Sequence, residues 1–142
     1  MDYIYNQIKN VFKAYNLDYN FDETNQNYQF SLDVFIEGFD PSMAMYIYVN
    51  ESELLFTMVT EKVKISEAVY TFINTWNFES LMFKVYIDDN HYLIIESYHG
   101  FVGRDHFQSL LRDILDVSSK EVLYFKDINH YFTIDTQEET TL

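Results

Sequence analysis

Asn74 and Asn77, three positions apart, are the first candidates for a catalytic role. They lie in the segment INTWN, where a helical pattern ends and a strand-like alternation follows. Asparagine can enter the left-handed backbone region at a helix C-terminus, where its amide can bond the last unsatisfied carbonyls. No nucleophile or base stands near the pair in the sequence. We therefore predict that both asparagines turn the chain and have no catalytic role.

The four histidines, His91, His99, His106 and His130, are the candidates for metal chemistry. His99 and His106 flank a glycine-containing segment and could approach each other near Asp105. A zinc site needs three or four ligands, however, and the sequence has no HExxH or comparable spacing. We expect surface histidines, with no metal and no cofactor.

Other catalytic patterns are missing from the sequence. Asp88 with Asp89, and Glu138 with Glu139, are adjacent in the chain, so in a strand their side chains would point to opposite faces and could not share a proton. The sequence contains no GxSxG elbow, and no glycine-rich loop followed by Lys and Ser or Thr. These observations predict a protein that is not an enzyme.

Length and composition predict a single folded domain. The chain has 142 residues, of which 48% are hydrophobic and 19% aromatic, far too apolar for a disordered protein. The sequence has only three glycines and one proline, the residues that most often break helices and strands. This scarcity favours short polar connections between the elements. We predict one domain over residues 1–134 and a frayed tail over residues 135–142.

The charge of the chain restricts its partners. Nine Lys and Arg residues face 23 Asp and Glu residues, which gives a net charge of −14. This balance argues against direct binding to nucleic acid or to an anionic membrane surface. The sequence contains no cysteine, no long apolar segment and no basic-then-apolar N-terminal signal. We therefore expect a cytoplasmic protein without disulfides.

Helical and strand-like patterns alternate along the chain in groups. Helical spacing of apolar residues predicts helices over residues 3–16, 65–76 and 105–117, the second capped by Ser66 or Thr60. Period-two alternation predicts strands over residues 28–36, 43–49, 54–59, 81–87 and 93–95. Residues 50–53 and 88–90 should form hairpin turns. Residues 16–27 break the pattern, and residues 122–125 are too few to classify.

This order, α-β-β-β-α-β-β-α, predicts an α+β fold. An antiparallel sheet of about five strands should carry three helices, mostly on one face. The order, together with INTWN, the Asp-Asp-Asn turn and the last amphipathic helix, resembles the YbjN-type bacterial sensory transduction regulators. That family has a fold similar to type III secretion chaperones. The resemblance implies regulation or chaperone-like protein binding, with no catalytic residues to carry over.

The second face of the predicted sheet is the most informative feature. If Phe83, Val85 and Ile87 face the helices, the alternate positions face away, and many of them are apolar or aromatic. An aromatic face on a soluble protein is typical of an interaction site. The alternative is that the C-terminal tail, rich in Tyr and Phe, folds back over it. The predicted protein-binding residues are Tyr46, Tyr48, Met82, Tyr86, Tyr92, Ile94 and Tyr98.

Two functions follow from these patterns. The first is an intracellular regulator or chaperone-like adaptor that binds another protein through the aromatic sheet face, with a homodimer as one form of that binding. The second is an acidic inhibitor, from a phage or mobile element, that mimics nucleic acid and occupies a nucleic-acid-binding groove. Carboxylates gathered on one surface would favour the second function, and an even spread would favour the first.

Overall fold

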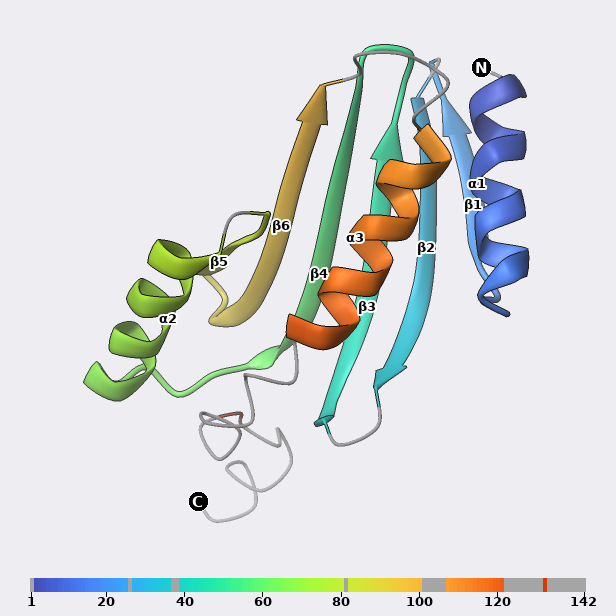
Figure 1. Cartoon of the computed structure of the whole chain (residues 1–142). Coiled ribbons are helices and arrows are strands. Elements are labelled where there is room, and N and C mark those ends of the chain that lie inside the picture. The colour runs from blue at the N-terminus through green and yellow to red at the C-terminus, as the bar shows by residue number, and fades with distance from the viewer. Residues whose placement is uncertain are drawn as a thin grey trace.

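The computed structural model describes residues 2–25, 27–36, 39–80, 82–100, 107–121 and 132. Within these residues, a six-stranded antiparallel sheet carries three helices on one face (Figure 1). In chain order the elements are α1 (Asp2–Ala14), β1 (Asn20–Thr24), β2 (Asn27–Ile36), β3 (Phe39–Val49), β4 (Glu53–Lys62), α2 (Glu67–Glu79), β5 (Lys84–Ile87), β6 (Tyr92–Gly100) and α3 (Phe107–Glu121). The α+β prediction with helices on one face is confirmed, and the sheet has one strand more than predicted.

The strands lie in the order β1-β2-β3-β4-β6-β5, so β1 and β5 are the two edges. β4 pairs with β6, while β5, which follows α2 in the chain, lies outside β6. Every pairing between named strands is antiparallel. The two predicted hairpins form, with turns over residues 50–52 and 88–91. At the first of these turns, the Asn50 side chain accepts hydrogen bonds from the backbone amides of Ser52 and Glu53.

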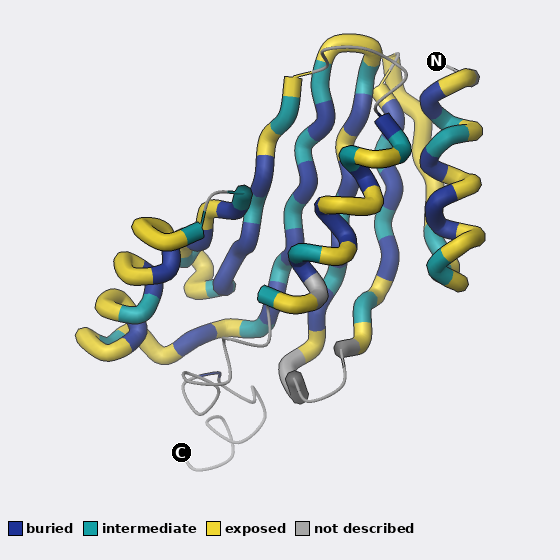
Figure 2. The backbone as a smooth tube through the Cα atoms, in the orientation of Figure 1, coloured by how far each residue is buried: buried dark blue, intermediate teal, exposed yellow. Residues whose placement is uncertain are grey.

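Period-two burial explains how the sheet forms its core. Along β4, Leu54, Phe56 and Met58 are fully buried and alternate with half-buried residues. The same alternation appears as blue and lighter bands along the strands in Figure 2. The helices contribute their apolar stripes to this layer, including Ile8 and Phe12 of α1, and sequestering such surfaces from water is the main driving force for folding.

β1 is the strand that the sequence pattern does not reveal. All five of its residues are exposed, and Phe21 is its single large apolar side chain. The Phe21 ring packs edge-on against Tyr5 of α1, with the ring centroids 4.8 Å apart, and it also contacts Tyr28 and Phe30 of β2. Because these contacts are tertiary, residues 16–27 carry no local alternation that predicts a strand.

The end of α1 shows which asparagine turns the chain. Asn16 has a φ of 55°, its backbone amide donates to the carbonyl of Lys13 (3.2 Å), and the next amide, that of Leu17, donates to the carbonyl of Phe12 (2.9 Å). This pair of bonds is the Schellman arrangement, in which a left-handed residue terminates a helix. At the start of α2, the Ser66 hydroxyl accepts from the Val69 amide, so Ser66 is the N-cap.

One residue of the C-terminal segment is described and lies in the core. Phe132 is 7% exposed, belongs to the main hydrophobic cluster and forms an isolated antiparallel bridge with Val63, just after β4. The expected frayed tail over residues 135–142 and the unclassified residues 122–125 lie outside the described residues. Within the described part of the chain, no helix has both the length and the apolar character needed to cross a membrane.

Candidate functional site

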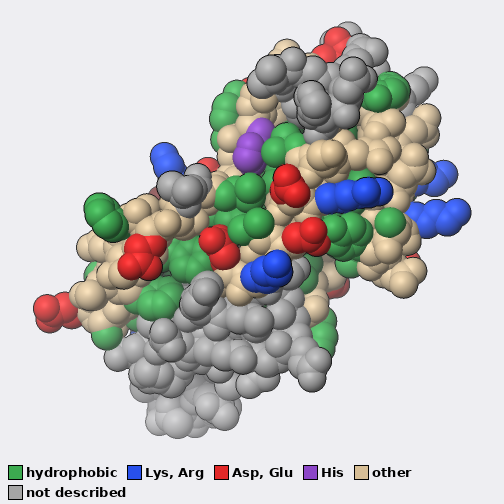
Figure 3. Space-filling model, viewed as in Figure 1, with side chains coloured by type: hydrophobic (Ala, Val, Ile, Leu, Met, Phe, Trp, Pro, Cys, Tyr) green, Lys and Arg blue, Asp and Glu red, His purple; other side chains and the backbone are tan. Residues whose placement is uncertain are grey.

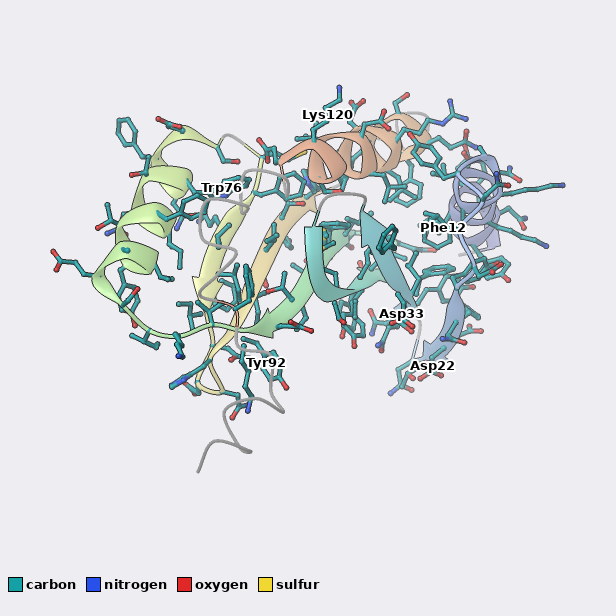
Figure 4. All side chains as sticks on the ribbon, turned by 90° about the horizontal axis from the view of Figure 1, so that it is seen from below. Phe12, Asp22, Asp33, Trp76, Tyr92 and Lys120 are labelled. Atoms are coloured by element: carbon teal, nitrogen blue, oxygen red, sulfur yellow. The ribbon has the colours of Figure 1, made fainter. Side chains whose placement is uncertain are left out.

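The outer face is the side of the sheet opposite the helices. In Figure 4 Asp22, Asp33 and Tyr92 point to this side, whereas Phe12 and Trp76 lie between the sheet and the helices. Strand alternation and pairing register assign its members. They are Asp22 of β1, Gln29, Ser31 and Asp33 of β2, Ala44, Tyr46 and Tyr48 of β3, Glu53, Leu55, Thr57 and Val59 of β4, Tyr92, Ile94, Glu96 and Tyr98 of β6, and Lys84 and Tyr86 of β5.

Five of the seven predicted protein-binding residues are accessible on this face. Tyr46 and Tyr92 are half-buried, and Tyr48, Tyr86 and Tyr98 are exposed, Tyr98 by 63%. The structure places the other two, Met82 and Ile94, differently.

Met82 lies outside β5, and Ile94 is nearly covered although it faces outward. β5 begins only at Lys84, so Met82 precedes the strand, and its partly buried side chain packs against the main core. Ile94 does face outward, between Val59 and Tyr86 in the register, but it is 8% exposed. The period-two pattern assigned the correct side to Ile94 and extended β5 too far at Met82.

Two of the outer-face tyrosines are held in place by carboxylates. The Tyr98 hydroxyl donates a 2.5 Å hydrogen bond to Oε2 of Glu53, and the Tyr86 hydroxyl donates a 3.0 Å bond to Oε2 of Glu96. The bond to Glu53 and its negative charge raise the pKa of Tyr98, and burial followed by the bond to Glu96 raises the pKa of Tyr86. Both hydroxyls therefore stay protonated and remain donors through neutral pH.

The remaining aromatic side chains of the outer face also make specific contacts. The rings of Tyr46 and Tyr48 are nearly parallel, with an interplanar angle of 18° and centroids 6.5 Å apart. The Lys62 ammonium lies 5.5 Å from the centroid of the Tyr92 ring, within the range of a cation–π contact. The outer face thus combines aromatic rings with charged groups, and it is more polar than the sequence pattern predicts.

Asn77 does not turn the chain, which corrects the first prediction from the sequence. α2 continues past it to Glu79, and the cap is Ser80, whose amide donates to the Trp76 carbonyl. The Asn77 amide nitrogen donates to the carbonyl of Val85 (2.9 Å), and its Oδ1 accepts from the Val85 amide (2.8 Å). Asn74 lies exposed within the helix, and neither residue has a positive φ. Asn77 therefore fastens α2 to the edge strand β5.

The described histidines and carboxylates do not form a metal-binding group. No three His, Asp or Glu side chains among the described residues gather into a group that could hold a metal ion, and His106, His130 and Asp105 lie outside them. His99, half-buried beside Ser97, has a lowered pKa because burial disfavours its charged form. His91, with a φ of 71°, occupies the left-handed position of the second hairpin turn.

Glu121, the last residue of α3, is a partly buried carboxylate. Its Oε2 is buried with no hydrogen-bond partner. Burial raises the pKa of this carboxyl, and a hydrogen bond from Ser80 opposes the shift. Among the described residues Glu121 belongs to no group of three His, Asp or Glu side chains that could hold a metal ion.

The carboxylates of the described residues are spread around the molecule. Asp22, Asp33, Glu53 and Glu96 lie on the outer face, while α2 and α3 carry their own, on the other side. Figure 3 shows acidic and basic side chains interspersed with hydrophobic ones on the helix-bearing face. This spread gives the nucleic-acid-mimic alternative no support within the described part of the chain.

Comparisons of the chain with protein-family models, with curated proteins and with solved structures find no match. The geometry of the molecule therefore carries the functional argument.

Proposed function

We propose that this protein is a non-enzymatic adaptor or regulator that binds another protein through the outer face of its sheet. The observation that carries the proposal is the set of exposed tyrosines there, with Tyr48 at 42%, Tyr86 at 41% and Tyr98 at 63% exposure. Tyrosine is enriched among the residues that dominate binding energy, because a large rigid ring loses little conformational freedom on binding.

The anchoring of these tyrosines supports the same function. The carboxylates of Glu53 and Glu96 fix the hydroxyls of Tyr98 and Tyr86 before any partner arrives. Side chains that are already ordered reduce the entropic cost of association. Helices cover the opposite side of the sheet, so the outer face is the broad sheet surface on which another chain could lie.

The resemblance to the YbjN-type regulators adds support of a second kind. Apart from the extra strand β1, the order of elements is the one on which that resemblance was based. Regulation by protein binding, without catalysis, is what such a family implies, and the cysteine-free sequence is in keeping with a cytoplasmic setting.

Matched surface variants test the proposal. The chain is immobilised and used to capture proteins from lysate of its native host. It is used as wild type and as two double variants, each of which removes two exposed aromatic rings. Tyr48→Ser with Tyr98→Ser removes outer-face rings, and Tyr70→Ser with Phe78→Ser removes exposed rings from α2. We expect the first variant alone to lose the specific partner. Light scattering over a concentration series shows whether the partner is a second copy of the chain.

The opposite pattern would overturn the proposal. If the α2 variant loses the partner and the outer-face variant retains it, the interaction surface lies on the helix-bearing side. Circular dichroism of each variant ensures that the loss is not a loss of folding.

A further inference from the structure

The outer face is organised in rows that run across the strands. In each of two rows the register places an aspartate on β1 or β2, uncharged residues in the middle, and a tyrosine on β6 or β5. The tyrosine hydroxyl bonds a glutamate, Glu53 of β4 in one row and Glu96 of β6 in the other. One row is Asp22, Gln29, Tyr48, Leu55 and Tyr98, and the other is Asp33, Ala44, Val59, Ile94 and Tyr86. Negative charge therefore lies on both sides of a less polar centre.

The tyrosine rings at one end of these rows are suited to cations. A phenol that donates a hydrogen bond to a carboxylate has a more electron-rich ring, and the face of an aromatic ring attracts Lys and Arg. The molecule already contains one such contact on this face, between the Lys62 ammonium and the Tyr92 ring. The described residues assigned to this face include four carboxylates, those of Asp22, Asp33, Glu53 and Glu96, and two ammonium groups, those of Lys62 and Lys84.

We propose that the partner presents a cationic, extended segment to the outer face, with Lys or Arg on both sides of an apolar residue. This inference rests on the proposed function and names the chemistry of the partner. With a net charge of −14, a second copy of the chain would bring like charge against the acidic ends of the rows, whereas a basic segment complements them.

The size of the sheet sets the spacing of the basic residues. The basic residues would pair with carboxylates at the two sides of the face. Asp22 on β1 and Glu53 on β4 lie three strand spacings apart across the sheet, or about 14 Å, and so do Asp33 on β2 and Glu96 on β6. An extended segment that crosses the strands advances about 3.4 Å per residue, and alternate side chains point to the same side. The basic residues should therefore stand about four positions apart, with the apolar residue midway between them.

A peptide selection tests the proposal. The immobilised full chain is presented with a random peptide library, and peptides that also bind the Tyr48→Ser, Tyr98→Ser variant are removed. We expect the remaining peptides to carry two Lys or Arg residues at the stated spacing. Binding of the best peptide, measured by fluorescence anisotropy, should weaken about tenfold when both basic residues become Gln.

Charge variants of the protein provide the matched control. Glu53→Gln with Glu96→Gln should weaken the same peptide about tenfold, and Glu67→Gln with Asp113→Asn, which removes two carboxylates from α2 and α3, should leave binding within about twofold. Added salt should weaken the wild-type complex and have less effect on the Glu53→Gln, Glu96→Gln variant.

The outcomes separate the two proposals. Face-dependent peptides that are neutral or acidic, or binding that is unaffected by salt, overturn the cationic partner and leave the outer face as a binding surface. A selection in which no peptide distinguishes the wild type from the Tyr48→Ser, Tyr98→Ser variant overturns the proposed function as well.

Discussion

Replacing Asn77 with alanine should loosen the attachment of α2 to the free edge of the sheet. Asn77 is exposed, yet its side chain makes both hydrogen bonds to Val85 that a neighbouring strand would otherwise make. β5 is an edge strand, and the outward amide and carbonyl of such a strand are open to pairing with other chains. One side chain thus performs two tasks, docking the helix and covering the edge.

The expected cost follows from these two bonds. Each side chain-to-backbone bond contributes about 1 kcal/mol net, so together they contribute about 2 kcal/mol. Alanine has a higher helix propensity than asparagine, which stabilises the helix by about 0.5 kcal/mol. The free energy of unfolding should therefore fall by about 1.5 kcal/mol. With a urea m-value of about 2 kcal/mol/M, the unfolding midpoint should fall by about 0.7 M.

Asn74→Ala is the control, because Asn74 lies exposed in the same helix, one turn earlier. It should leave stability unchanged or raise it by about 0.5 kcal/mol. Hydrogen exchange adds a local measurement: the Val85 amide should lose protection in Asn77→Ala and keep it in Asn74→Ala. Equal midpoints for the two variants, with the Val85 amide equally protected, would refute the role assigned to Asn77.

Three further outcomes are expected. Because burial raises the pKa of Glu121, its charged form destabilises the fold, so Glu121→Gln should raise the melting temperature at pH 7, and the gain should disappear below about pH 4. The lowered pKa of His99 means that the unfolded chain binds more protons, so wild-type stability should fall as pH drops below about 6.5, and His99→Gln should reduce that slope in urea titrations. Phe21→Ala should cost about 2 kcal/mol and increase hydrogen exchange in β1, because three ring contacts are lost; unchanged exchange there would contradict the packing argument.

The parts of the fold that can be predicted are those with a local period. Ile8 and Phe12 in α1, and Leu54 and Phe56 in β4, repeat at helical and strand spacing, and the structure buries all four. The same period assigned the tyrosines of the outer face to the correct side of the sheet. β1 has no such period, because Phe21 depends on Tyr5, which is distant in sequence.

The errors at individual residues have a common cause. Asparagine suits the left-handed region wherever it occurs, and sequence alone did not distinguish Asn16, which adopts it, from Asn77, which bonds a strand. In the second hairpin the left-handed residue is His91, while Oδ1 of Asp88 accepts from the amides of Asn90 and Tyr92. The tyrosine–glutamate pairs were also missed, because cross-strand partners depend on the register.

The pairing of β4 with β6 has a consequence for how the chain folds. A chain that has been synthesised only to the end of α2 contains β4 but not yet β6, which pairs with it. The strand that carries Leu54, Phe56 and Met58 is then an unpaired edge of the sheet. Pairing over this separation is slow compared with local hairpin formation, and unpaired edges promote aggregation. Nascent molecules should therefore be most vulnerable to aggregation, and most in need of a chaperone, until residues 92–100 have emerged.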